Sequence, residues 1–415
     1  MTRVLVQLNS LGLGGTQLNA LDFATEVAQW GYESVLIGPA DTIPQGPSLF
    51  DVATERGLEL STFVRPLSTL SGARTMSELA NRFRADIVHV YGSWDYRAAW
   101  WGACSLGRRP LVQTVYEMTV EKLTHTHTSL IVGTKYLEEE LSARAGGVRL
   151  ISPPVDVSRD NAAIVPTTAF IRSHALNRNN LRVVIVSRLD EEMKASSVQT
   201  AIEAIGLMGR QDVDLVVVGT GDAEQRLKKI GDAVNLKMGR KAVVFTGPMA
   251  DAREAYAAAD VMIGMGGSAA RTLSFGKPLI VAGEAGWFRL FTPATSQEIF
   301  HSSFWSAEVV ANPAQPLADM LGAILDDGPL KESLGNFGRS FAEAHFGLPA
   351  MAKKLADTYS AALDTFGPRA WTRDLAIEAV HLHRRLLAGP LPAYLPGPGS
   401  RKNWIKGGFN GSRSE

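Results

Sequence analysis

The stretch "LRVVIVSRL", residues 181–189, decides the fold, because it begins a second series of strand-like runs after a break. Later runs of this kind are "DLVVVGTG" (214–221), "AVVFTGP" (242–248), "ADVMIGMG" (259–266) and "KPLIVAG" (277–283). Before the break, helical patterns alternate with "RVLVQLN" (3–9), "ESVLIGP" (33–39), "LELSTFV" (58–64), "ADIVHVYG" (85–92), "PLVQTVY" (110–116), "SLIVGT" (129–134) and "VRLIS" (148–152). Apolar strands separated by helices are typical of a parallel sheet covered on both faces. We therefore predict an α/β fold with two Rossmann-like, doubly wound domains that face a cleft.

The break itself covers residues 152–180, which are polar, contain three prolines and show no long period. We expect this segment to connect an N-terminal domain, residues 1–165, to a C-terminal domain, residues 181–348. Helical periodicity returns over residues 349–388. Residues 389–415 are rich in Gly and Pro, so we expect a mobile tail, available at most for a weak contact with a membrane or a partner.

The composition excludes several classes of function. The 415 residues include 42 Lys and Arg and 42 Asp and Glu, so the formal net charge is zero and no global field attracts nucleic acid. The only cysteine, Cys104, excludes an internal disulfide framework and a multi-cysteine metal site. The N-terminus lacks a signal-peptide pattern, and no window approaches ~18 uninterrupted apolar residues. We expect a cytoplasmic protein that recognises any phosphate locally.

A glycine-rich turn follows the first predicted strand. Gly12, Gly14 and Gly15 lie directly before Thr16, at which a helical pattern starts. Backbone N–H groups at a helix start suit an anion or a polar sugar. The spacing is not G-x-G-x-x-G, so it does not indicate a dinucleotide site, and a purely structural turn remains equally compatible with it.

Two cations follow the first strand of the second series. Arg188 and Lys194 lie in the loop between that strand and a helix. At the carboxyl edge of a parallel strand, an Arg fork and a Lys point charge are placed to bind a diphosphate. Alternatively, they are solvated loop charges balanced by Asp190, Glu191 and Glu192.

The last strand–helix turn contains an unusual charge. In "GMGGSAARTLSFGKP", residues 264–278, Ser268 is a candidate N-cap, and Arg271 stands where a Glu would complete a capping box. A cation in the first turn opposes the helix dipole at a cost of roughly 0.3–1 kcal/mol. Arg271 therefore either points into water or accompanies an anion.

Taken in order, these motifs resemble the large sucrose-synthase-like family of group 1 glycosyltransferases, which are retaining, use nucleotide sugars and have the GT-B fold. The resemblance runs from about residue 3 to about residue 360. Gly14, Gly15 and Thr16 match the family's Gly-Gly turn, and Arg188 and Lys194 match its R…K pair on the donor diphosphate. Further matches are "ISPPVD" (151–156), Phe245–Gly247, and the glycines and the Gly-Lys-Pro of residues 264–278.

The resemblance implies a hexosyltransferase that moves a sugar from a nucleoside-diphosphate sugar to an acceptor with retention. No metal and no other cofactor would be needed, since Arg188 and Lys194 would stabilise the leaving diphosphate. The C-terminal domain would bind the donor, and residues 349–388 would pack back across both domains. The implied donor-binding residues are Gly14, Gly15, Thr16, Gly219, Gly221, Thr246, Gly247, Gly266, Gly267, Ser268 and Arg271.

The acceptor would lie on the N-terminal domain and would be a small molecule, a glycan or a lipid-linked molecule. Candidate acceptor-binding residues are Tyr91, Trp94, Asp95 and Glu117.

The sequence departs from the family at two positions. Arg271 replaces a ribose-binding glutamate, and Tyr116 stands where many members have an active-site histidine. His89 matches another histidine of the family and is either catalytic, like Tyr116, or a packed structural residue. We hypothesise that Arg271 contacts a phosphate or an acidic sugar. Two alternatives remain: a degenerate, non-catalytic glycosyltransferase-like partner protein, and a sugar-nucleotide epimerase on the same fold.

Overall fold

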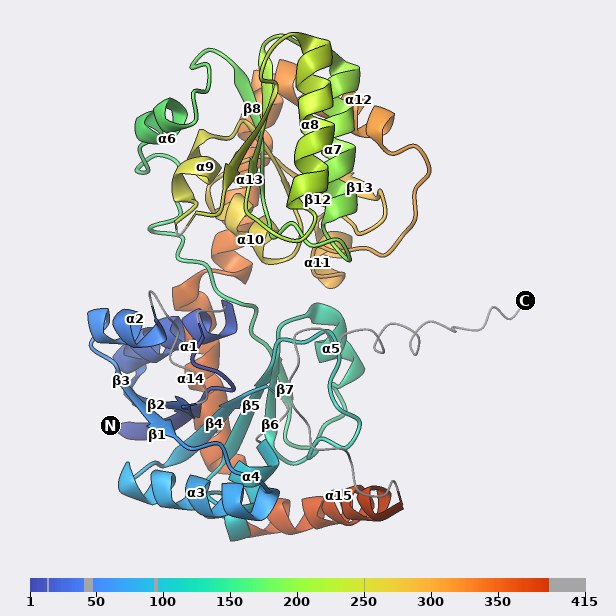
Figure 1. The fold of residues 1–415 in the computed structure, drawn as a ribbon. Helices are drawn as coiled ribbons and strands as arrows, with labels where there is room; N and C mark the ends of the chain where they lie inside the picture. Colours follow the sequence, from blue (N-terminus) through green and yellow to red (C-terminus); the bar gives the residue numbers. More distant parts are fainter. Residues whose placement is uncertain (13–14, 41–47, 93–95, 250, 388–415) are drawn as a thin grey trace.

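Two sheets, one in each half of the chain, organise the structure (Figure 1). The structure is a computed structural model that describes residues 1–12, 15–40, 48–92, 96–249 and 251–387. Gly14, Trp94, Asp95 and the predicted tail beyond residue 388 lie outside these residues. Among the residues described, no helix is long and apolar enough to cross a membrane.

The N-terminal sheet is entirely parallel and has the strand order β3-β2-β1-β4-β5-β6-β7. Its inner strands are buried on both faces, which explains why they appear in the sequence as continuous apolar runs. The strands are β1 (Thr2–Gln7), β2 (Tyr32–Pro39), β3 (Glu59–Phe63), β4 (Ile87–Tyr91), β5 (Leu111–Val115), β6 (Ser129–Val132) and β7 (Val148–Leu150).

The C-terminal sheet has the order β10-β9-β8-β11-β12-β13, and only β13 is antiparallel to its neighbour. The strands are β8 (Leu181–Val186), β9 (Val213–Val218), β10 (Val243–Gly247), β11 (Val261–Gly264), β12 (Leu279–Ala282) and β13 (Phe288–Leu290). The predicted α/β class with two doubly wound domains is confirmed, and each quoted run overlaps one of the strands β1–β12. The sequence did not predict β13.

Helices cover both faces of the N-terminal sheet. One face packs against α1 (Gly15–Glu26), α2 (Leu49–Glu55) and α14 (Leu348–Thr365). The other face packs against α3 (Thr69–Arg82), α4 (Tyr96–Trp101) and α15 (Pro368–Leu387). The short helix α5 (Lys135–Glu140) covers β5–β7 through Leu137.

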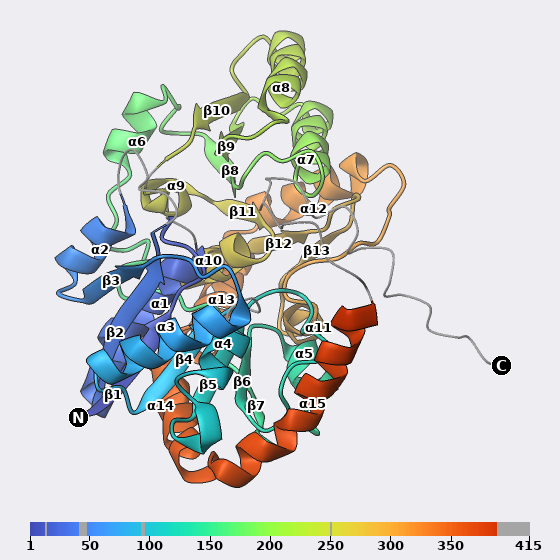
Figure 2. The same ribbon diagram turned by 60° about the horizontal axis from the view of Figure 1, so that its bottom comes forward.

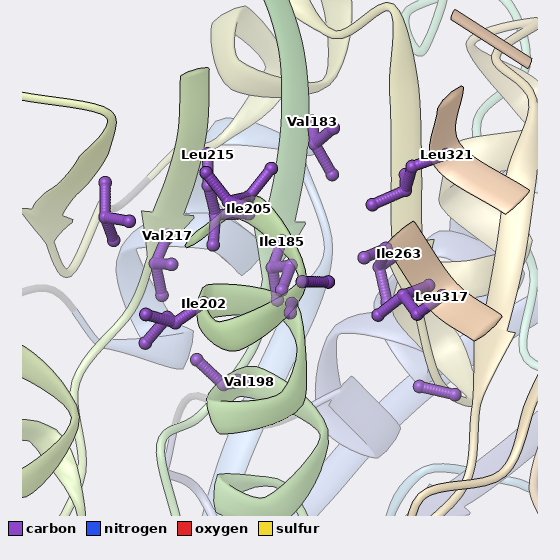
Figure 3. Packing of buried hydrophobic residues seen from close by; sticks show 14 of the residues in the cluster. Val183, Ile185, Val198, Ile202, Ile205, Leu215, Val217, Ile263, Leu317 and Leu321 are labelled. Atoms are coloured by element: carbon purple, nitrogen blue, oxygen red, sulfur yellow. The ribbon is translucent and has the colours of Figure 1, made fainter. Parts of the chain in front are cut away.

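The C-terminal sheet is covered in the same way. One face carries α7 (Ala195–Met208), α8 (Glu224–Met238) and α12 (Ala314–Asp326), and the other carries α6 (Thr168–Ser173), α9 (Arg253–Ala258), α10 (Gly267–Ser274), α11 (Ser296–His301) and α13 (Gly328–His345). Figure 3 shows Ile202 and Ile205 of α7 packed near Ile185 of β8 and Leu215 and Val217 of β9. Burying each such side chain stabilises the fold by about 1.5–3 kcal/mol, which fixes the strand whose end carries Arg188.

The chain crosses twice between the two halves, and the crossings are hydrogen-bonded to each other. The Val155 N–H donates to the Phe346 carbonyl (2.8 Å), and the Leu348 N–H donates to the Val155 carbonyl (3.1 Å). After the second crossing, α14 buries Met351, Leu355 and Tyr359 in the N-terminal core. The C-terminal helices therefore belong by packing to the first half of the molecule.

Candidate active site

The carboxyl ends of β8 and β11 form the switch point of the C-terminal sheet, because the chain leaves these neighbouring strands in opposite directions. Ligands of doubly wound sheets bind in the crevice at such a point. The loop after β8 carries Arg188 and Lys194, and the turn after β11 leads through Gly266 into Gly267 and Ser268 at the start of α10. The fold thus brings these predicted donor-site residues to one edge.

Arg188 and Lys194 form a cationic pair without a bonded acid. Neither side chain makes a hydrogen bond or an ion pair with any other described residue, although Arg188 is exposed and Lys194 is half-buried. Burial lowers the pKa of Lys194 to about 8, and the charge of Arg188 acts in the same direction, against Asp190 and Glu284. Lys194 is also the N-cap of α7, at the positive end of that helix. A bound anion would offset the burial of the Lys194 ammonium, its repulsion by Arg188 and the positive end of the helix dipole.

Glu191 and one carboxylate oxygen of Asp190 bond to groups other than the two cations. Glu191 forms an ion pair with Arg226 (2.7 Å), and its backbone N–H donates to Asp222 Oδ1. Asp190 accepts the Met193 backbone N–H (2.9 Å) and reaches Lys194 only through longer-range attraction. No hydrogen bond or ion pair within the loop balances Arg188 and Lys194, although the charge of Asp190 attracts Lys194 and its Oδ2 has no hydrogen-bond partner among the described residues.

Gly219 and Gly221 hold the loop that carries Arg188. A Cβ on Gly219, whose φ is +135°, would lie 1.9 Å from the Ser187 carbonyl oxygen, and one on Gly221 would lie 2.2 Å from that of Leu189. Only glycine allows the loop after β9 to approach so closely. The Leu189 N–H donates to the Thr220 carbonyl (3.0 Å) across this contact. These glycines position Arg188 from both sides, whether or not they also touch the donor.

Thr246 and Gly247 lie at the end of the edge strand β10. Gly247 has a φ of +78° and follows a register shift, and its carbonyl accepts the Gly219 N–H (3.0 Å). The Thr246 hydroxyl donates to the same carbonyl (3.0 Å). This turn therefore supports the β9 loop.

The start of α10 corrects two expectations. The N-cap is Gly266, with a φ of +60°, and the helix begins at Gly267, so Ser268 is not the N-cap; its hydroxyl bonds to the backbone of Met265. Arg271 consequently lies in the last turn of an eight-residue helix. A cation there is favourable for the helix dipole, so the expected dipole cost was wrong.

Arg271 has a partner within the chain. Its Nε donates to Asp160 Oδ2 (2.8 Å), and Asp160, in the connection between the two halves, is only 2% exposed. Arg253 lies 4.0 Å from the same carboxylate. Asp251 also attracts the Arg271 charge and helps to raise its pKa, and Arg271 acts to lower the pKa of Asp22. The guanidinium is thus compensated by protein carboxylates, and this geometry does not favour the predicted contact with a donor phosphate.

The switch point of the N-terminal sheet lies between β1 and β4. Gly15 begins α1 there and is exposed, followed by Thr16. A Cβ on Gly92 would lie 3.4 Å from Asn9 Nδ2 and 3.9 Å from Glu117 Oε1, so these two polar groups gather beside it. Glu117 is exposed, as an acceptor-binding residue must be.

Two predicted residues of this domain, His89 and Tyr91, are buried, and so is the hydroxyl of a third, Tyr116. His89 is 1% exposed, and its ring nitrogens bond to the Tyr359 and Thr114 hydroxyls (2.7 Å each). Burial lowers its pKa to about 3, so it stays neutral and bridges α14 to the sheet. Tyr91 is 2% exposed, and the buried Tyr116 hydroxyl has no hydrogen-bond partner among the described residues. Burial raises the pKa of both tyrosines, and this geometry does not support a proton-transfer role for His89 or Tyr116.

Sequence reasoning missed two polar residues at the strand ends. Asn9 follows β1, and its side-chain oxygen accepts from Gln17 Nε2 (2.8 Å). Glu284 follows β12, accepts from the Trp305 indole N–H (2.8 Å) and lies near Lys194. Both are polar residues placed directly after a buried strand, and that signal was available in the sequence.

Comparison with known proteins identifies the family to which the chain belongs. The family model described as "Glycosyl transferases group 1" matches residues 180–316, and the one described as "Glycosyltransferase Family 4" matches residues 13–159. The chain belongs to the group 1 glycosyltransferases. No protein with a curated description matches this glycosyltransferase in sequence.

Solved structures share its fold. A glycosyltransferase from Rickettsia africae has a TM-score of 0.70 at 15% identity, over 87% of this chain and 98% of its own. Alr3699/HepE from Anabaena, solved in complex with UDP, has a TM-score of 0.65 at 18% identity, over 87% and 100%. A putative UDP-N-acetylglucosamine 2-epimerase from Listeria monocytogenes has a TM-score of 0.57 at 13% identity, over 85% and 94%. The fold is therefore GT-B, with two Rossmann-like domains.

Proposed function

We propose that this glycosyltransferase moves a sugar from a nucleoside-diphosphate sugar to an acceptor, with retention of configuration and without a metal ion. The observation that carries the proposal is the pair Arg188 and Lys194, which lacks a bonded acid and lies at the switch point of the C-terminal sheet. The Anabaena structural neighbour was solved with UDP and with UDP-glucose, which supports a donor of this class. Retention rests on the resemblance of the ordered motifs to a retaining family.

The proposed mechanism is electrostatic stabilisation of the leaving diphosphate. Breaking the glycosidic bond places negative charge on the diphosphate, and fixed cations beside it lower the barrier. The Arg188 fork and the protonated Lys194 ammonium would supply two such donors, with the N-terminus of α7 as a third positive element. Each donor of this kind contributes about 3 kcal/mol, so the pair replaces the role that a metal ion has in other transferases.

The same proposal divides the chain between the two substrates. Residues 181–348 would bind the donor through the loops after β8 and β11, and residues 1–165 would bind the acceptor near Glu117 and Asn9. An epimerase receives less support, because it needs acid and base groups that reach the sugar, whereas His89 is fully enclosed.

The test is a transfer and donor-hydrolysis assay with UDP-sugars. Arg188→Ala and Lys194→Ala should each reduce the rate at least ~100-fold, as the loss of a transition-state donor does. Lys241→Ala, which removes an exposed cation before β10, is the matched control and should retain full activity.

Wild-type rates in both site variants would refute the assignment. Complete loss of activity with a chelator, restored by a divalent cation, would refute metal independence. Tight donor binding without any turnover would favour a non-catalytic partner protein.

A further inference from the structure

One face of the N-terminal half carries an excess of positive charge, although the chain as a whole is neutral. The helices α3, α4 and α15 lie side by side over this face of the sheet, and they share one core around Met76, Trp100 and Trp371 (Figure 2). The whole sequence has a formal net charge of zero. We call the exposed side chains of α3, α15 and the loop 64–68 before α3 the basic face.

The outward charges of α15 are all positive. Arg369, Arg373 and Arg384 are exposed and make no ion pair with other described residues. The two acids of this helix point inward: Asp374, fully buried, accepts from the backbone N–H groups of residues 126 and 127, and Glu378 accepts from Arg97, His125 and Trp101. Packing of the helix thus buries both of its carboxylates in hydrogen bonds and leaves these three arginines in solvent.

The α3 side adds cations and protruding aliphatic side chains. Arg74 and Arg82 are exposed; Arg74 forms an ion pair with Glu78 (2.8 Å), the only exposed acid on the helix, and Arg82 makes no ion pair with another described residue. Val64, Leu67 and Leu70 are 85%, 103% and 81% exposed. No acidic residue occurs between residues 60 and 77. On α15, Val380 and Leu382 are also exposed, so aliphatic groups and arginines occur together on both helices.

We propose that the basic face docks on the surface of an anionic lipid bilayer. Cations beside exposed aliphatic side chains match the two parts of such a surface, the anionic headgroups and the acyl boundary beneath them. A nucleic acid would use the arginines but not the aliphatic groups. The core of a protein interface is normally depleted in charge and enriched in aromatic residues, and the exposed apolar residues here are aliphatic. The proposal is independent of the donor chemistry.

Vesicle co-sedimentation of the full chain tests the proposal. Binding to vesicles with one third phosphatidylglycerol should be at least about tenfold tighter than to pure phosphatidylcholine, and it should weaken with salt. Arg74→Gln/Arg369→Gln/Arg373→Gln should lower binding to the anionic vesicles at least about tenfold. The matched control, Lys229→Gln/Lys237→Gln/Lys241→Gln, removes three exposed cations from the C-terminal domain and should bind like the wild type.

The aliphatic groups have their own pair of variants. Leu67→Ser/Leu70→Ser should reduce vesicle binding several-fold, whereas Leu236→Ser/Val309→Ser, which alters equally exposed residues of the other domain, should not. Absence of binding to anionic vesicles, or equal binding by site and control variants, would overturn the proposal. A change in oligomeric state of the site variants without lipid would identify the face as a self-association surface instead, which also overturns it.

Discussion

Two arginines at the same edge of the C-terminal sheet have opposite surroundings. Arg188, after β8, has no bonded acid among the described residues, and its charge disfavours protonation of Lys194. Arg271, on α10 after β11, donates to the buried Asp160 and is surrounded by further carboxylates. A structural cation is paired with carboxylates of the protein, whereas a cation available to a ligand is not. Whether such a carboxylate is present depends on segments far away in the sequence. Arg188 is therefore the better candidate for an anionic substrate.

The largest effect is expected from moving the loop of Arg188. Gly219→Ala would place a Cβ 1.9 Å from the Ser187 carbonyl oxygen at a φ of +135°, so the loop must shift. We expect a loss of transfer activity of about 100-fold, because a misplaced donor loses its transition-state contact. Gly239→Ala is the control, since Gly239 also has a positive φ, +68°, but a Cβ there would have no neighbouring atom within 4 Å. Equal activity of the two variants would contradict the positioning role of Gly219.

A second effect should appear in stability. Arg271→Ala leaves Asp160 nearly fully buried with only Arg253 nearby, at 4.0 Å, so we expect a loss of roughly 2–3 kcal/mol in the free energy of unfolding, discounted because the Arg271 side chain is 44% exposed. The control Arg226→Ala breaks an exposed pair with Glu191 and should cost under about 1 kcal/mol. Chemical denaturation measures both.

The pH dependence of this loss supplies a further check. Burial raises the pKa of Asp160, so its charged form is the unfavourable one in the folded state. Removal of Arg271 should raise that pKa further, and the loss caused by Arg271→Ala should then shrink as the pH falls from neutral through the folded pKa. A loss that grows with acidification would contradict the burial argument.

A smaller effect should come from Lys194. Burial lowers its pKa to about 8, and only the protonated amine attracts a diphosphate. Since the phosphates of UDP are already ionised above about pH 7, affinity for UDP should fall by up to about tenfold between about pH 7 and pH 9. Lys194→Arg should flatten this profile, because a guanidinium keeps its charge. A profile that is equally steep in both proteins would assign the titration to another group.

The fold was predictable because its signals are local. Apolar runs such as residues 181–189 indicate strands that are buried on both faces, and the alternation of such runs with helical patterns also located the partly exposed β3, β7 and β10. The short antiparallel β13 is partly exposed and has no such run. The start of α10 was misplaced because a serine resembles an N-cap, whereas the positive φ of Gly266 is visible only in the structure.

The site was less predictable because its partners are distant. Arg271 meets an acid 111 residues earlier in the chain, and His89 bonds to a tyrosine 270 residues later. The local sequence shows a histidine at a strand end in both the catalytic and the structural case. Only the tertiary structure, with Tyr359 of α14 on one side and Thr114 of β5 on the other, shows that both ring nitrogens of His89 are occupied.

Calorimetry of UDP binding to the wild type, Arg188→Ala and Arg271→Ala tests the central claim most directly. The account predicts that Arg188→Ala weakens binding at least about tenfold, the loss of one charge-assisted hydrogen bond. It predicts a change below about threefold for Arg271→Ala, measured where that variant is fully folded. The opposite order, with Arg271→Ala weakened and Arg188→Ala unchanged, would show that the compensated arginine holds the donor and would contradict the account.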